Sequence, residues 1–88
     1  MRVTVIPEDK WIRRDDQSAN LPEWPFEDAN IHAIQWYEDY GEIERNGTPK
    51  PQNELFTNPT ILEPYISALE TYAALLAEQA AEAVSDEV

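Results

Sequence analysis

What the sequence lacks narrows the range of folds and functions open to it. The chain of 88 residues contains no cysteine, so neither disulfide bonds nor thiolate metal ligands are available. A single histidine, without cysteine, excludes a structural zinc site in practice. No apolar run approaches the length of a membrane span. We therefore expect one small domain with a thin apolar core and with no metal or cofactor.

Basic residues are scarce and unevenly placed. The net charge is −12, and all six basic residues lie within the first 50 positions, so residues 51–88 carry acidic charge alone. Because phosphate contacts need clustered Lys and Arg, we expect neither nucleic-acid binding nor binding to anionic membranes. The acidic surface is either a solvated surface that keeps the protein in solution or a nucleic-acid mimic that fits a partner's basic groove.

The start of the chain bears on where the protein is made. The first seven residues hold one arginine and an apolar run too short for a secretory signal. We therefore expect synthesis in the cytoplasm and retention there, unless a larger particle carries the protein out.

The first half has the pattern of short strands. Apolar and polar residues alternate over residues 2–6, and a turn containing Pro7 lets residues 10–14 return as the second strand of a hairpin. Residues 31–37 are rich in β-branched and aromatic side chains, and a turn closed by Gly41 leads to a strand over 42–46. We expect an antiparallel β-meander of three or four strands, with a polar turn over residues 15–20.

Two prolines separate the predicted hairpins. Pro22 and Pro25 each favour extended backbone in the preceding residue, so we expect an irregular extended segment over residues 21–28. This segment either packs on the sheet or docks on a partner. Its large apolar side chains are Leu21, Trp24 and Phe26.

The second half predicts one long helix. Residues 51–63 form a proline-containing linker, and Pro64 suits the first turn of a helix that we expect to run to about residue 84. The C-terminal region, residues 64–88, should end in a frayed acidic tail. The sequence therefore predicts an α+β fold, with a β-rich part over residues 1–50, the linker and the helix.

The predicted helix carries an apolar stripe with the spacing of a coiled-coil seam, about 3.5 residues. The seam consists of Leu62, Ile66, Leu69, Ala73, Leu76, Ala80 and Ala83. A second stripe beside it consists of Ile61, Tyr65, Ala68, Tyr72 and Leu75. Either the whole apolar face packs on the chain's own sheet, or its alanine-rich end packs against other helices. We expect the second arrangement, and with it an oligomer, because alanine buries little area within one chain.

The residues offer little for catalysis. A nucleophile needs a base within reach, and the only histidine, His32, should be partly buried in its strand on the face of Ile34 and Trp36. Glu42 and Glu44 share a strand face, and we expect a solvated edge strand rather than an acid–base pair. The sequence therefore predicts a protein that is not an enzyme and that binds other macromolecules.

Parts of the chain resemble small proteins encoded among the tail and tail-fibre genes of tailed bacteriophages. The central match is Ile31-His32-Ala33-Ile34-Gln35-Trp36 followed by Gly41-Glu42-Ile43-Glu44. Two further matches are the opening Val5-Ile6-Pro7-Glu8-Asp9 and the alanine-rich helix that follows Leu62-Glu63-Pro64-Tyr65-Ile66. Residues 15–26 form a longer insert that departs from the pattern of these proteins.

The resemblance implies a minor structural component of a phage tail, at the baseplate or at the attachment of a tail fibre. Its partners would be other tail proteins, bound through the C-terminal helix as a homo- or hetero-oligomer. Its location would be the host cytoplasm during assembly and then the virion. The resemblance supplies no catalytic residue and no cofactor. Two alternatives remain open: a tail-fibre assembly chaperone, and an acidic nucleic-acid mimic that inhibits a host protein.

Overall fold

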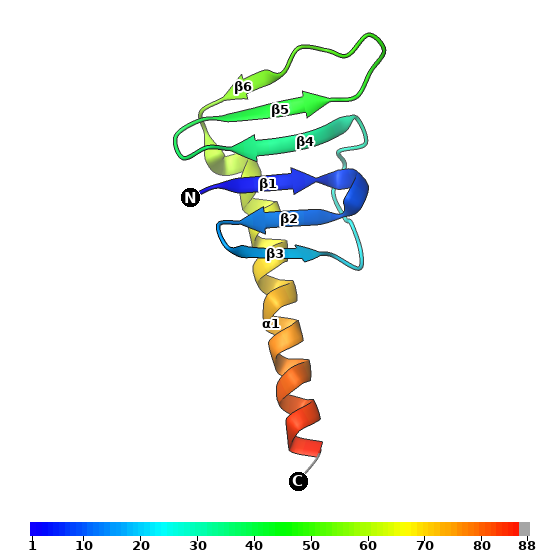
Figure 1. Cartoon of the computed structure of the whole chain (residues 1–88), viewed down its shortest axis with the longest axis vertical. Coiled ribbons are helices and arrows are strands. Elements are labelled where there is room, and N and C mark those ends of the chain that lie inside the picture. The colour runs from blue at the N-terminus through cyan, green and yellow to red at the C-terminus, as the bar shows by residue number, and fades with distance from the viewer. Residues whose placement is uncertain (87–88) are drawn as a thin grey trace.

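The protein is a six-stranded antiparallel sheet with one helix packed on a single face (Figure 1). The computed structural model describes residues 1–86, and it describes side chains up to residue 81. Residues 87 and 88 of the predicted acidic tail lie outside the described residues. The predicted α+β fold, an antiparallel sheet followed by one C-terminal helix, is confirmed.

The elements follow one another along the chain with short connections. The strands are β1 (Val3–Ile6), β2 (Trp11–Arg14), β3 (Gln17–Asn20), β4 (Ile31–Trp36), β5 (Gly41–Arg45) and β6 (Glu54–Phe56). The 3-10 turn η1 (Pro7–Asp9) joins β1 to β2, and η2 (Pro59–Leu62) leads into the helix α1 (Glu63–Asp86). Both predicted hairpins are present, since β1 pairs with β2 and β4 pairs with β5.

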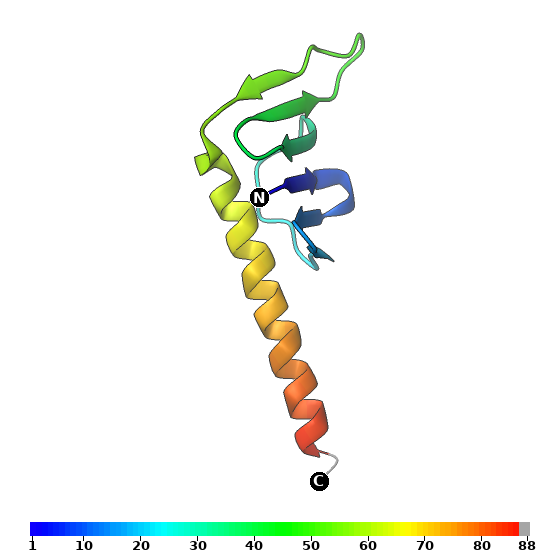
Figure 2. The ribbon, with the colours of Figure 1, turned by 60° about the vertical axis from the view of Figure 1, so that its left-hand side comes forward.

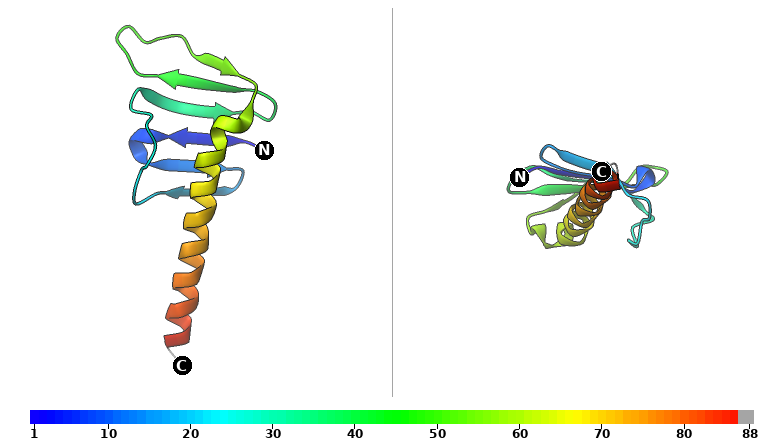
Figure 3. Two further views of the ribbon diagram at one scale, coloured as in Figure 1. Left: turned by 180° about the vertical axis from the view of Figure 1, so that it is seen from behind. Right: turned by 90° about the horizontal axis from the view of Figure 1, so that it is seen from below.

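The strand order, β3-β2-β1-β4-β5-β6, differs from that of a simple meander. β1 lies in the middle of the sheet and pairs with both β2 and β4. The chain after β3 runs along one end of the strands, on the helix side, before β4 begins (Figures 1 and 3). β1 is suited to the centre because Val3 and Val5, 1% and 0% exposed, fill the core beneath it.

Two edge strands were missed in the sequence. β3 lies within the stretch that was predicted to be a polar turn, residues 15–20. The turn in the structure consists only of Asp15 and Asp16, and Asp15 lies in the left-handed region at φ 51°. β6 lies within the predicted linker. Each strand turns one partly buried apolar side chain toward the core, Ala19 in β3 and Phe56 in β6. A single apolar residue gives no alternation to recognise, and backbone pairing with the neighbouring strand forms these edges.

Gly41, which was expected to close the turn, has a steric role and does not adopt a left-handed conformation. Among the described residues no glycine has a positive φ, and the residue of the β4–β5 turn that does is Glu38, at 114°. A Cβ on Gly41 would lie 2.6 Å from the Gln35 carbonyl oxygen and 2.6 Å from Cε1 of Phe56. Glycine at this position lets the Phe56 ring lie over β5 and pack against Trp36, with ring centroids 5.4 Å apart.

The core forms where α1 crosses the sheet. Leu62 and Leu69 are fully buried and Tyr65 is 8% exposed, all packed with the inward residues of the central strands. These sheet residues are Val3, Val5, Ile12, Ile34 and Trp36. The opposite face of the sheet has no helix on it in the described part of the chain (Figure 2).

The helix is longer than the sheet is wide. α1 has 24 residues, which corresponds to about 36 Å, and its second half extends past β3 into solvent (Figures 1 and 2). The molecule measures 58 × 27 × 17 Å with a radius of gyration of 15.6 Å. A compact domain of this length has a radius of gyration of about 12 Å, so the projecting half of α1 gives the molecule its elongated shape.

Candidate functional site

The predicted seam is divided by the edge of the sheet. Leu62 and Leu69, at the start of the predicted seam, are core residues of the chain itself, and Ile66 packs partly buried against them. They are buried because β1, β2 and their neighbours lie opposite this part of the helix. Further along, Ala73 is half-buried, while Leu76 and Ala80 are exposed. Ala83 lies outside the residues whose side chains are described.

The second stripe is divided in the same way. Tyr65 is buried, and Ala68 and Tyr72 are partly buried against the core. Ile61, just before the helix, is 42% exposed, and Leu75 is 45% exposed. Both stripes therefore contribute to the chain's own core in the first half of α1 and face solvent further along.

The projecting half of α1 continues the apolar face of the helix beyond the sheet. We call residues 73–86 the overhang. At its start lie Leu75 and Leu76, 45% and 44% exposed, and then a run dominated by alanine, which lets another backbone approach closely. The overhang contains acidic residues and no basic one. The overhang therefore presents a narrow apolar surface among acidic residues.

The start of α1 is held by a buried polar centre. Asp28, 8% exposed, accepts hydrogen bonds from the Tyr65 hydroxyl at 2.7 Å and from Nε1 of Trp24 at 2.9 Å. Burial first, and then the hydrogen bond and charge of Asp28, raise the pKa of Tyr65 above the ordinary tyrosine value of 10.0. This centre ties the segment before β4 to the first turn of the helix.

The predicted docking segment packs against this centre. Leu21 is 6% exposed and belongs to the core, and Trp24 and Phe26 are partly buried against it. The Phe26 ring lies 4.3 Å from the Tyr65 ring and 4.9 Å from the Trp24 ring, centroid to centroid. Of the two predicted alternatives, the structure shows the one in which the segment packs on its own sheet and helix.

An open groove of about 950 Å³ lies beside Trp24 and Phe26. Its polar lining includes Asp28, which already accepts two hydrogen bonds, and Arg45, which is ion-paired with Glu54. Among the residues whose side chains are described, no three histidine, cysteine or acidic side chains lie together as a metal site would require. The Asp28 and Arg45 side chains in the groove are therefore already partnered.

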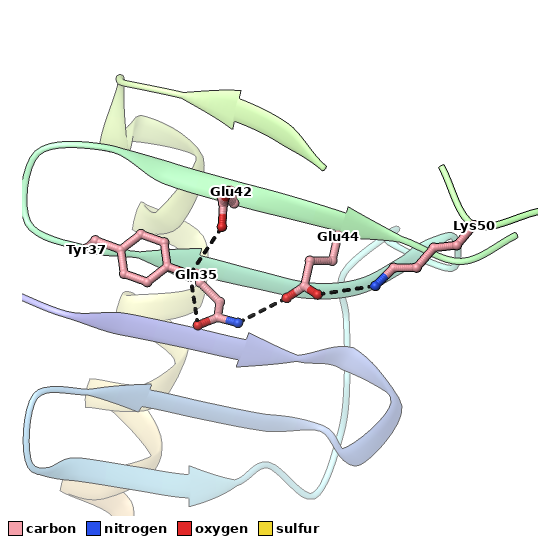
Figure 4. A network of polar contacts seen from close by, with 5 residues as sticks. All are labelled: Gln35, Tyr37, Glu42, Glu44 and Lys50. Atoms are coloured by element: carbon pink, nitrogen blue, oxygen red, sulfur yellow. Dashed lines mark hydrogen bonds and ion pairs between the residues drawn. The ribbon is translucent and has the colours of Figure 1, made fainter. Parts of the chain in front are cut away.

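The helix-free face of the sheet carries a polar network, shown in Figure 4. Nε2 of Gln35 donates to Glu44 at 3.0 Å, and the Tyr37 hydroxyl donates to Glu42 at 3.2 Å. Nζ of Lys50 lies 3.6 Å from Glu44. β5 was predicted as a solvated edge, but β6 pairs outside it, so Glu42 and Glu44 are half-buried and partnered. Desolvation first, and then the Glu42 hydrogen bond, raise the pKa of Tyr37.

His32 is exposed, in contrast to its predicted partial burial. The register between β4 and β5 shifts between Ile31 and Ala33, so His32 is the extra residue of a β-bulge. A bulge breaks the alternation of side chains along a strand, which is why His32 does not share the inward face of Ile34 and Trp36.

No helix in the described residues is both long enough and apolar enough to cross a membrane. Comparisons of the chain with protein-family models, with curated proteins and with solved structures find no match.

Proposed function

We propose that this protein is a non-enzymatic assembly protein whose overhang binds protein partners, and that it serves as a minor component of a bacteriophage tail. The observation that carries the binding role is the overhang itself. Its leucines are 45% and 44% exposed, whereas Leu62 and Leu69 at the other end of the same apolar face are fully buried. An apolar face that continues beyond its own sheet is suited to a second surface.

The tail assignment is supported by the resemblance of the Ile31–Trp36 and Gly41–Glu44 stretches to phage tail-region proteins. The test is mass spectrometry of purified, DNA-filled particles of the phage that encodes the chain, with quantification against a known tail protein. A fixed ratio of a few copies per tail supports a structural component. Absence from particles, with abundance in the infected lysate, contradicts it and leaves the assembly chaperone.

The role of the overhang has its own test, with matched variants. Leu76→Gln replaces the exposed leucine of the seam, seven positions after Leu69. Ala74→Gln places the same amide side chain on the other side of the helix. Neither variant changes charge, and glutamine keeps good helix propensity. We expect loss of the protein from particles for Leu76→Gln but not for Ala74→Gln. Equal incorporation of both variants would contradict a binding role for this face.

A second candidate function is supported by the net charge of −12, which suits a nucleic-acid mimic that binds a basic host protein. It predicts an affinity that falls steeply as salt is raised, because exposed charges are screened over about 8 Å at physiological ionic strength. Affinity for a basic host partner that is unchanged between low and high salt would contradict it.

A further inference from the structure

β3 is the edge strand next to the overhang, and its outer edge is open. It is the last strand on its side of the sheet. The N–H of Leu21 donates to the Lys10 carbonyl oxygen at 2.8 Å, so Lys10 and Leu21 form a hydrogen-bonded cross-strand pair at the end of the β2–β3 ladder. Since such pairs alternate along an antiparallel ladder, Gln17 and Ala19 bond to β2. The backbone N–H and C=O groups of Ser18 and Asn20 therefore point away from the sheet.

The two edges of the sheet differ in how they are protected. Natural edges are commonly blunted by charge, proline or shortness. β6 has only three residues, and one of them, Glu54, carries a charge in an ion pair with Arg45. β3 has four residues, Gln17–Asn20, with neither charge nor proline. The unprotected edge is the one beside the overhang.

The spacing of the helix shows where another strand would fit. Strands lie about 4.8 Å apart and a helix rises about 1.5 Å per residue, so a helix that crosses the strands passes one strand for about every three residues. Glu70 is ion-paired with Arg14 of β2, which places Leu69 and Glu70 opposite that strand. Tyr72 and Ala73, half-buried, then fall opposite β3. Leu76 falls opposite the position just outside β3.

We propose that β3 accepts a further β-strand, supplied by a basic protein partner, which extends the sheet over the overhang and covers Leu76. This proposal rests on the assembly role proposed above and specifies the kind of partner. The added strand bonds to the outward backbone groups of Ser18 and Asn20. Its side chains alternate, so that apolar residues face the helix and Lys or Arg residues face away.

Charge decides between a basic partner and a second copy of the chain. The net charge is −12, and the overhang and the neighbouring Asp15–Asp16 turn carry acidic residues without a basic residue among them. A second copy would bring the same negative surface against the first, which is unfavourable because like charges face one another. A strand that carries Lys and Arg is attracted instead by the net negative charge of the chain.

The test uses the full chain, labelled with ¹⁵N and ¹³C, and a synthetic peptide of alternating Val and Lys residues with blocked ends. We expect chemical-shift changes at the β3 amides and at the Leu76 methyl groups. An alternating Val and Glu peptide should bind much more weakly. Absence of binding by the Val–Lys peptide at millimolar concentration would overturn the proposal, and so would equal binding of both peptides.

Two proline variants distinguish the edges. Ser18→Pro removes an outward N–H, a substitution that edge strands tolerate, and loss of one such hydrogen bond corresponds to about tenfold weaker binding. Leu55→Pro makes the same change on β6, where Leu55 is 71% exposed, and should leave the affinity unchanged. Equal affinity of the two variants would contradict strand addition at β3. Circular dichroism of both variants checks that the sheet is retained.

The Leu76→Gln variant separates failure of this proposal from failure of the assembly role. If Leu76→Gln weakens peptide binding and Ser18→Pro does not, strand addition is wrong and the overhang remains a binding surface. If neither variant weakens peptide binding, strand addition at β3 is wrong, and incorporation of Leu76→Gln into particles decides the assembly role. A dimer of the unbound chain in sedimentation equilibrium that Ser18→Pro dissociates would show that a second copy occupies the edge, which overturns the basic partner.

Discussion

At the scale of single residues, burial separates side chains that look equivalent in the sequence. Leu69 and Leu76 are the same residue type on the same helix face, seven positions apart. Leu69 is 0% exposed and Leu76 is 44% exposed. The difference arises because β2 lies opposite one of them and no strand of the chain lies opposite the other. The two leucines therefore have different energetic roles.

Leu69→Ala should lower the free energy of unfolding by about 2–5 kcal/mol, since it removes a fully buried side chain and leaves a cavity. Leu76→Ala should change it by less than about 1 kcal/mol, because much of that side chain already contacts water. Urea denaturation of both variants measures the difference. Equal destabilisation would mean that Leu76 is covered within the free chain.

Tyr65 should make stability fall at alkaline pH. Its pKa is raised in the folded state, whereas the unfolded chain ionises near the ordinary value of 10.0. Its contribution is therefore complete below pH 10 and is lost as the pH rises through the folded-state pKa. Urea unfolding at pH 9, 10 and 11 should show a steeper decline for the natural chain than for Tyr65→Phe. Parallel curves would contradict the raised pKa.

At the scale of elements, β6 and β3 show how short edges are attached. β6 is bonded to β5 and placed by the contact of Phe56 with Trp36, which depends on the missing side chain of Gly41. β3 is bonded to β2 and contributes Ala19 to the core. Both strands depend on the neighbouring strand more than on their own residue preferences.

Gly41→Ala should displace β6 and cost about 1–3 kcal/mol, because the added methyl group overlaps the Gln35 carbonyl oxygen as well as Phe56. Combining it with Phe56→Ala should relieve only part of this cost, since the backbone oxygen cannot move away. Urea denaturation, with amide exchange of β5 and β6, checks both expectations. If the changes in unfolding free energy of the two substitutions simply add, the added methyl group does not contact the Phe56 ring.

At the scale of the whole molecule, the length of α1 and the width of the sheet do not match. The core is complete in the first half of the helix, where Leu62, Tyr65 and Leu69 are buried. The second half adds length to a molecule of 58 Å and carries only acidic charge. Folding of the domain and binding through the overhang are therefore expected to be separable.

A chain that ends after Ala77 should keep its fold, with a free energy of unfolding within about 1 kcal/mol of the full chain, because the side chains from 78 to 81 are exposed. The same truncation should reduce incorporation into particles without abolishing it, because it removes most of the overhang but keeps Leu75 and Leu76. Urea denaturation and particle composition measure the two effects. Loss of the sheet on truncation would show that the overhang belongs to the domain's own core.

Local patterns were sufficient for part of this structure. Alternation in residues 2–6 and β-branched and aromatic content in residues 31–37 predicted the two main hairpins, because side-chain periodicity reflects which face of a strand is buried. The apolar spacing after Pro64 predicted the long helix for the same reason. The bulge at His32 and the steric need for Gly41 could not be predicted, because they depend on how β4 and β5 register and on where Phe56 packs.

By itself, then, the sequence determined the α+β class, the two hairpins, the helix and its apolar stripe, since these follow from the periodicity of neighbouring residues. The tertiary structure alone decided the strand order, the edge strands β3 and β6, and the position on α1 at which burial ends. A repeat of about 3.5 residues is the same whether a sheet or a second protein covers it. Which of the two meets each leucine depends on how many strands lie beneath the helix, and that number is set by contacts between residues far apart in the chain.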